Sequence, residues 1–450
     1  MVKNEFSILD KFISNSNLIL FIKLVPIFFF VSLYFFQSPP LGLSQQAWTT
    51  VIIFLIAAYM LSTEITHMSI TAIIIIFMLF LTSAVPASVA LYGLGSKSFF
   101  LIFIGFLVAI GMEASGLDER VAHEVLKYCH TERSVILGVL IITAGLSMIM
   151  SNTTTVIMML PIIKQITSKT NLNKIAIYLS IAFGANVGGV GFLIGTPPNV
   201  IAAEALGFGF LEWLRIGFPF MLIMIFLLYI SFLIYFKPKH EIEKFKLKHL
   251  GPWSRKEKIA CSITILTVVL WLTSFLHSLS TITVGLIGGV LMFLFVYDWK
   301  FFQKQTDWGV LILLAGTVSL GKALETTGAA TWVAEKFLQI TGFENPLWIA
   351  FAFVLLAMVI TQFISNTATA GILTPVLIGI SATIGVRPEV LVIPMVLIVS
   401  MTFLLPPGTA PNALVYNATG ISVKEFIKAG ILPTIFSIIA VFFYCIFMIV

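Results

Sequence analysis

The sequence predicts an all-α membrane protein with about eleven transmembrane helices, two re-entrant hairpins and two broken helices. Of its 450 residues, 59% are hydrophobic and only 10% are charged. The mean hydropathy of +1.06 lies well above the range of water-soluble domains. Many apolar runs approach the roughly 20 residues that cross about 30 Å of hydrocarbon as a helix. Polar phrases or proline-containing breaks interrupt four of these runs at matched positions.

The spans follow in chain order from these apolar runs. Residues 18–36 are too long for the hydrophobic region of a signal peptide and lack a small-residue cleavage site, so we expect a retained first span. Further spans are expected near residues 47–63, 68–86, 97–116, 174–207 with a break, 216–236, 259–276, 281–298, 308–326, 389–417 with a break, and 430–449.

Two apolar segments, residues 134–166 and 346–384, are each interrupted by the phrase Ser-Asn-Thr. If each segment enters and leaves on one side as a re-entrant hairpin, all basic loops fall on the same side of the membrane. The largest of these loops, residues 237–258, holds eight Lys or Arg residues, and the positive-inside rule places it in the cytoplasm. We therefore expect a multi-pass protein of the plasma (inner) membrane with a cytoplasmic N-terminus and an external C-terminus. The net charge of +6 follows this distribution, so no nucleic-acid partner is expected.

The chain contains two copies of a unit of about 210 residues. The phrase SNTTTVIMMLPII at residue 151 recurs as SNTATAGILTPVL at 365, and GTPPN at 195 recurs as GTAPN at 408. Four matched pairs in one order make chance an implausible explanation. The other two pairs are SGLDERVA at 115 with TGAATWVA at 327, and FLEWLRIGFP at 210 with VKEFIKAGILP at 423.

The duplication predicts how the interrupted segments are arranged. A unit with five crossings ends on the opposite side of the membrane from where it begins. The second copy therefore starts on the opposite side from the first, so the two copies form inverted repeats. The two hairpin tips then meet near the bilayer midplane, an arrangement typical of secondary transporters. Non-helical backbone at that depth is tolerated only where it lines an enclosed or watery cavity.

The residue types at the tips and breaks predict which solutes bind there. Asn and Thr side chains supply hydrogen-bond donors, and a helix N-terminus after each tip favours an anion. Glycines and prolines in the breaks free backbone carbonyls, which suit a hard cation. Neither motif holds Lys or Arg. Because a dianion desolvated without a counter-charge is costly, we expect bound sodium ions to compensate it.

The repeat predicts paired sodium ligands. Ser147 stands four residues before Ser151, and Thr361 stands four before Ser365, so each pair shares one helix face. One sodium ion is predicted at Ser147, Ser151, Asn152 and Gly195, and its twin at Thr361, Ser365, Asn366 and Gly408.

The paired Ser-Asn-Thr phrases, each followed by a Gly-Thr-x-Pro-Asn break, resemble the divalent anion:sodium symporter family over about residues 45–450. The resemblance implies a homodimer in which a mobile transport domain carries substrate and sodium past a scaffold by an elevator movement. It also implies substrates such as succinate, malate or fumarate, with citrate or sulfate in some members. In the second copy, Ala410 replaces a proline that is common beside the substrate in the family. The substrate-binding residues that the resemblance implies are Ser151, Asn152, Thr153, Thr196, Pro197, Ser365, Asn366, Thr367, Thr409 and Ala410.

The sequence favours a sodium-coupled carrier of small dicarboxylates. A sodium-independent dicarboxylate exchanger and a carrier of citrate or sulfate remain alternatives. An intramembrane enzyme would need an acid, base, nucleophile or metal cluster inside the spans, and none is visible. A channel would show rings of charged side chains or carbonyl groups around a symmetric pore, whereas this duplication lies within one chain and is inverted.

The expected organisation is an N-terminal segment with the first span at 1–44, scaffold spans at 45–116, a transport-domain hairpin and broken helix at 117–207, scaffold and linking spans at 208–326, a second transport-domain hairpin and broken helix at 327–420, and a last span at 421–450.

Overall fold

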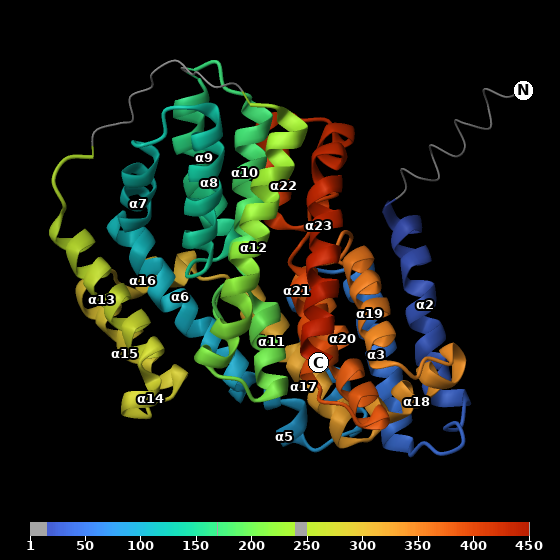
Figure 1. The fold of residues 1–450 in the computed structure, drawn as a ribbon. Coiled ribbons are helices and arrows are strands. Elements are labelled where there is room, and N and C mark those ends of the chain that lie inside the picture. The colour runs from blue at the N-terminus through green and yellow to red at the C-terminus, as the bar shows by residue number, and fades with distance from the viewer. Residues whose placement is uncertain (1–15, 169, 239–249, 450) are drawn as a thin grey trace, which may run out of the picture.

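The computed structural model describes residues 16–168, 170–238 and 250–449, and all regular elements in these ranges are helices (Figure 1). Residues 239–249, half of the basic loop at 237–258, lie outside the described residues. The first half contains α2 (Ser16–Phe36), α3 (Gln45–Thr63), α4 (Met68–Leu81), α5 (Ala87–Ala90), η1 (Tyr92–Gly95), α6 (Lys97–Ser115), α7 (Leu117–Leu126), α8 (Glu132–Ser147), α9 (Asn152–Thr167), α10 (Lys174–Gly188), α11 (Pro197–Leu206) and α12 (Phe210–Phe236). The second half contains α13 (Arg255–Leu272), α14 (Ser274–His277), α15 (Thr281–Phe295), α16 (Trp299–Gln305), α17 (Trp308–Thr326), α18 (Ala329–Thr341), α19 (Pro346–Ile360), α20 (Asn366–Ile384), α21 (Glu389–Val399), η2 (Pro406–Gly408), α22 (Ala410–Thr419) and α23 (Val423–Ile449).

The helical, multi-pass membrane class is confirmed. Among the described residues, six helices are long and apolar enough to cross a bilayer, and a seventh span results if α18 and α19, bent by 101°, are counted together. Four shorter apolar helices, α4, α10, α15 and α21, lie between them. The predicted total of eleven crossings stays a prediction. The six long spans are α3, α6, α12, α17, α20 and α23.

The chain leaves the helical conformation at all four predicted interruptions. Helix α8 ends at Ser147 before α9, and α19 ends at Ile360 before α20. The two G-T-x-P-N phrases separate α10 from α11 and α21 from α22. Proline lies at N1 or N2 of both α11 and α22, where its missing N–H costs no helical hydrogen bond.

Two spans begin earlier than the hydropathy pattern predicts. Helix α12 begins at Phe210 rather than near residue 216, and α23 begins at Val423 rather than near 430. The amphipathic patches at 210 and 423 are therefore the first turns of these long helices. In α12 the carboxylate of Glu212 accepts a hydrogen bond from the backbone N–H of Gly209 at 2.9 Å, which caps the early start.

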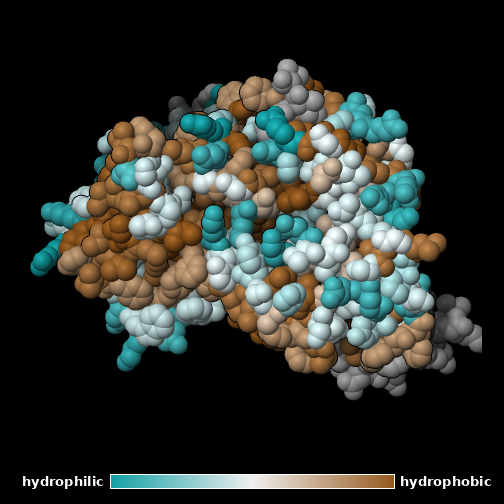
Figure 2. Space-filling model, turned by 90° about the horizontal axis from the view of Figure 1, so that it is seen from below, coloured by the Kyte–Doolittle hydropathy of each residue, from teal (hydrophilic) through white to brown (hydrophobic). Residues whose placement is uncertain are grey.

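The two halves of the chain interlock in the centre of the molecule. Helix α10 packs against α22, and α21 packs against α11, so each half supplies a partner to the other. In Figure 1, α8, α9 and α10 lie in the upper part and α11 and α18 in the lower part. Helix α17 packs against α4 and α20. Many outward-facing aromatic and aliphatic side chains, including Phe28, Phe77 and Leu294, are exposed, as expected for a surface in lipid. Figure 2 shows broad hydrophobic areas beside hydrophilic side chains on the lower face.

Candidate functional site

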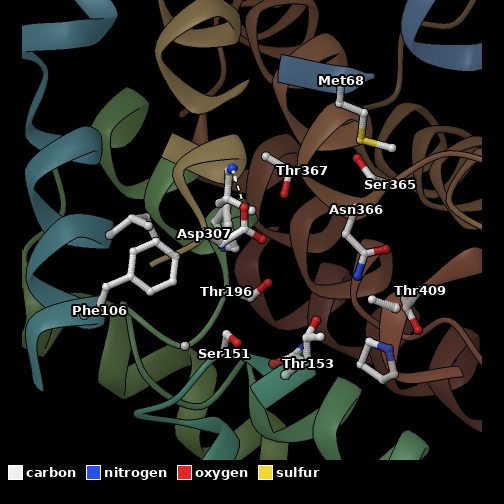
Figure 3. Close-up of a pocket in the computed structure, with 18 of the residues that line it drawn as sticks. Met68, Phe106, Ser151, Thr153, Thr196, Asp307, Ser365, Asn366, Thr367 and Thr409 are labelled. Carbon is white, nitrogen blue, oxygen red and sulfur yellow. Dashed lines mark hydrogen bonds between the residues drawn. The ribbon is translucent and has the colours of Figure 1, made fainter. Parts of the chain in front are cut away.

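A cavity of about 390 Å³ lies where the four interrupted segments meet. Its volume falls within the roughly 300–1,000 Å³ of small-molecule sites. Figure 3 shows side chains of both halves around this common space, with Ser151, Thr153 and Thr196 from the first half and Asn366 and Thr409 from the second. All ten residues predicted to bind substrate line it, namely Ser151, Asn152, Thr153, Thr196, Pro197, Ser365, Asn366, Thr367, Thr409 and Ala410.

Four helices begin at this cavity. The residues that precede the first turns of α9, α11, α20 and α22 are Ser151, Thr196, Ser365 and Thr409, and all four line the cavity. Because the first N–H groups of a helix lack internal partners and carry partial positive charge, four such ends favour an anion. Among the described residues that line the cavity there is no Lys or Arg. Backbone N–H, amide and hydroxyl groups are therefore the donors available to an anion.

Three oxygen atoms lie close together beside the Ser-Asn-Thr phrase at residue 151, and one hydroxyl hydrogen is shared among them. The Oγ of Ser147 lies 2.6 Å from Oδ1 of Asn152 and 2.9 Å from the carbonyl oxygen of Ala185. A single hydroxyl hydrogen cannot serve both acceptors fully. Ser147 is fully buried, and the acceptor excess is the kind of environment that a hard cation satisfies.

The second phrase repeats this cluster 214 residues later. The Oγ1 of Thr361 lies 2.8 Å from Oδ1 of Asn366 and 2.9 Å from the carbonyl oxygen of Val399. Thr402 adds a hydroxyl 3.1 Å from the same Val399 carbonyl. The serine-to-threonine difference between the halves leaves the hydroxyl oxygen in place, so the two clusters share three oxygens and the second has one more.

Two predicted glycines lie where the backbone of one segment touches another. A Cβ atom added at Gly195 would lie 2.5 Å from the carbonyl oxygen of Gly189 and 3.1 Å from that of Met148. A Cβ atom at Gly408 would lie 2.5 Å from the Thr402 side chain and 3.2 Å from the Gln362 carbonyl oxygen. A side chain would collide with these atoms, so glycine allows the close approach of neighbouring segments at both positions.

The eight predicted sodium ligands fall into two groups. Ser147 and Thr361 are fully buried behind the cavity, where they contact Asn152 and Asn366. The other six, Ser151, Asn152, Gly195, Ser365, Asn366 and Gly408, line the cavity itself. Their role as sodium ligands remains a prediction.

Sequence reasoning missed the asparagines that end the two G-T-x-P-N phrases. The amide of Asn199 donates to the carbonyl oxygens of Gly189 and Phe192, both at 2.8 Å. Asn412 makes the matching bonds to Thr402 at 3.0 Å and Leu405 at 3.2 Å. These amides hold the unwound segments in shape. Their recurrence at matched positions was the signal that could have identified them.

Two acidic side chains at the cavity were also missed. Glu64 follows α3, and Asp307 precedes α17, where it accepts a hydrogen bond from the N–H of Val310 at 3.1 Å. Both line the cavity and are exposed. Neither belongs to a repeated phrase, and no local pattern in the sequence indicates that these span ends approach the Ser-Asn-Thr tips.

The sequence matches the citrate transporter family over residues 51–399, which is most of the chain. The chain belongs to this family of divalent anion:sodium symporter type. Its members are transporters and not enzymes, so this chain is a transporter. A relative from Staphylococcus saprophyticus, the sodium-dependent dicarboxylate transporter SdcS, is 31% identical over 77% of this chain and 75% of its own.

Two further comparisons cover nearly the whole transporter. An uncharacterized transporter from Haemophilus influenzae is 31% identical over 95% of this chain and 96% of its own length. The crystal structure of the Alcanivorax borkumensis YdaH transporter superposes with a TM-score of 0.60 at 11% identity, covering 85% of this chain and 98% of that one. At this identity the structural likeness concerns the fold alone.

Proposed function

We propose that this transporter moves small dicarboxylates of the succinate, malate and fumarate class across the plasma membrane, coupled to sodium. The observation that carries the proposal is the convergence of four helix N-termini on a cavity whose described lining holds no Lys or Arg. Two pairs of helix ends suit the two carboxylates of one solute. The relatives named sodium-dependent dicarboxylate transporter support the same substrate class.

Sodium ions supply the positive charge that the lining side chains lack. Each Ser-Asn-Thr phrase has a buried oxygen cluster behind it, at Ser147 with Asn152 and at Thr361 with Asn366. A cation in each cluster offsets the cost of moving a dianion out of water. Binding of the anion and binding of sodium therefore favour each other, which is the requirement for coupled transport.

The transport movement follows from the arrangement proposed for the two halves. Residues 117–207 and 327–420 form a mobile body that carries the cavity, and residues 45–116 and 208–326 form the scaffold. The mobile body slides as an elevator within a homodimer, with the N-terminus cytoplasmic and the C-terminus outside. The duplicated hydrogen bonds of Asn199 and Asn412 support two structural copies of one unit.

Citrate is the second candidate substrate, because the matching family is described as citrate transporter. Citrate carries a third carboxylate and needs more room than succinate. Ala410 supplies some of that room, since a proline there would project further into the cavity. A sodium-independent exchanger and a sulfate carrier are the remaining alternatives.

Uptake of radiolabelled succinate into proteoliposomes tests the proposal. We expect saturable uptake that rises with an inward sodium gradient and is inhibited by malate and fumarate. Uptake that ignores sodium but requires internal dicarboxylate would show an exchanger. Uptake of citrate or sulfate with no succinate binding would overturn the substrate class.

A further inference from the structure

Helix α11, which begins at the cavity, carries near its other end a carboxylate that bonds to two other elements. The Oε2 of Glu204 accepts a hydrogen bond from the backbone N–H of Ser98 at 2.8 Å. Its Oε1 accepts one from the hydroxyl of Tyr92 at 3.2 Å. Ser98 also donates through its own hydroxyl to the carbonyl oxygen of Val200 at 3.1 Å. Glu204 thus joins α11 to two elements more than a hundred residues away.

The groups that Glu204 holds are themselves fixed. Ser98 lies in the first turn of α6, where its N–H has no helical partner and the helix dipole favours a negative charge. Tyr92 opens η1, and the neighbouring Gly93 donates its N–H to the buried hydroxyl of Ser319 on α17 at 2.9 Å. Any Cβ at Gly93 would lie 1.9 Å from the Ala315 carbonyl oxygen, so η1 lies directly on α17.

The Tyr92 hydroxyl is a donor at physiological pH. Burial and the adjacent Glu204 carboxylate raise the pKa of Tyr92 above its ordinary value, so the phenol keeps its proton. Lys322 lies with its ammonium group 5.7 Å from the Tyr92 ring centroid and pairs with Glu325 within α17 at 3.1 Å. Glu325 therefore lies near Tyr92 and Lys322, and it pairs with Lys322 of its own helix and not with α11.

These contacts border a second cavity of about 410 Å³ between α11, α17 and α20. The first cavity includes Asp307 at the start of α17, whereas the second includes Lys322 and Glu325 near its end. At 1.5 Å per residue, these two ends of α17 are about 27 Å apart. The side chain of Thr374 on α20 lines the second cavity and is only 2% exposed.

We propose that Glu204 is a positioning residue that latches α11, and with it the substrate-binding break at Thr196 and Pro197, to α6 and η1 in the conformation of this structure. This inference rests on the proposed elevator movement, because α11 belongs to the mobile body and α6, η1 and α17 to the scaffold. The latch must release before the mobile body slides. Its strength sets how long the transporter stays in this state.

Thiol labelling of Thr374→Cys measures release of the latch. The variant is made after replacement of Cys129, Cys261 and Cys445, and the protein is reconstituted in nanodiscs, where a hydrophilic methanethiosulfonate reaches both faces. Movement of α20 along α17 exposes the introduced thiol. We expect Glu204→Ala to raise the labelling rate about tenfold, as loss of hydrogen bonds to a charged acceptor predicts.

Three variants make this test specific. Glu325→Ala removes a carboxylate from the same cavity but breaks only a pair within α17, so we expect an unchanged labelling rate. Glu204→Gln retains an acceptor for Ser98 and should restore most of the slow labelling. Tyr92→Phe removes one hydrogen bond only, and we expect a smaller increase. If Glu204→Ala does not fold, an unchanged rate in Tyr92→Phe overturns the latch.

The outcomes separate the latch from the proposed substrate. Unchanged labelling in Glu204→Ala, with sodium-dependent succinate uptake intact, would overturn the latch and leave the carrier in place. Faster labelling in a protein that takes up no dicarboxylate would retain the latch and overturn the proposed function. Equal increases in Glu204→Ala and Glu325→Ala would mean a general loosening of the cavity, and the latch would be rejected.

Discussion

The hydroxyl of Ser147 lies 2.6 Å from the amide oxygen of Asn152, and the same relationship recurs between Thr361 and Asn366 at 2.8 Å. In both places the hydroxyl oxygen is fully buried and a helix-end carbonyl oxygen lies within 2.9 Å. Three convergent oxygens recur behind each Ser-Asn-Thr phrase, and the hydroxyl of Thr402 adds a fourth at the second phrase. The shared three oxygens supply matched controls within one chain.

We expect Ser147→Ala and Thr361→Ala each to weaken sodium activation of uptake, because each removes one oxygen from a cation cluster. Loss of one ligand should raise the half-saturating sodium concentration by about tenfold, which corresponds to about 1.4 kcal/mol. Sodium titration of succinate uptake measures the effect. Ser147→Thr and Thr361→Ser exchange the residues of the twin clusters and should stay close to the parent protein. Unaltered sodium activation in both alanine variants would remove these hydroxyls from the sodium sites.

Asn152→Ala and Asn366→Ala should each abolish transport while leaving the protein folded. Each asparagine lines the cavity and also contacts a buried hydroxyl, so truncation should weaken the binding of both the substrate anion and the sodium ion. Uptake should fall at least about a hundredfold, as expected when two or more polar contacts to bound charge are lost. Asn417→Ala, at an exposed position on α22, provides the control. Full activity in either cavity variant would contradict the site.

A buried ion pair outside the cavity should be essential for stability. Arg120 on α7 contacts Glu257 at the start of α13 through two bonds, Nε to Oε1 at 2.5 Å and Nη2 to Oε2 at 3.1 Å. Both residues are less than a tenth exposed. Arg120→Ala leaves a buried carboxylate without its partner and should cost about 3–5 kcal/mol, whereas Arg120→Met combined with Glu257→Leu should cost much less. Unfolding by SDS in mixed micelles measures the difference.

The pH dependence of this pair has a defined sign. The Arg120 guanidinium holds the pKa of Glu257 below its ordinary value. A lowered pKa means that the stabilisation is present at neutral pH and is lost as the pH falls through the pKa of the folded state. We expect the stability gap between the parent protein and Arg120→Ala to narrow in acid. A gap that widens below pH 4 would contradict this assignment.

Asp118 should show the opposite pH dependence. It is buried on α7, outside the long spans, and burial raises its pKa to about 6. A raised pKa means that its contribution is favourable below the ordinary pKa and is lost as the pH rises through about 6. Asp118→Asn should therefore stabilise the protein at pH 8 by up to about 3 kcal/mol, with no gain at pH 4.

The exposed neighbour of Asp118 provides the control for this experiment. The side chain of Glu119 is 44% exposed, so its neutralisation in Glu119→Gln should change stability little at either pH. Unfolding at several pH values compares the two variants. A stabilisation by Asp118→Asn that is equal at pH 4 and pH 8 would show that charge burial is not its cause.

The helix interruptions and the membrane class could be predicted from the sequence because they depend on local chemistry. Hydropathy reports burial in lipid directly, and Gly, Pro and Asn affect the backbone within a few residues of where they occur. The matched phrases at 151, 195, 365 and 408, through the family resemblance that they carry, predicted ten substrate-binding residues, and all ten line the cavity. Helix starts were less accurate, as α12 shows, because a polar first turn resembles a loop in hydropathy.

Which distant segments lie against the cavity and its helices depends on how the helices pack. Asp307 reaches the cavity, and Glu204 bonds to Ser98 from 106 residues away, although neither has a sequence pattern that indicates its partner. In a water-soluble helix an apolar stripe would reveal the inward face, but a helix in lipid is apolar on all sides. Local residue types therefore predict where the backbone breaks and which polar groups those breaks present. Close packing between helices far apart in the chain decided which groups face one another.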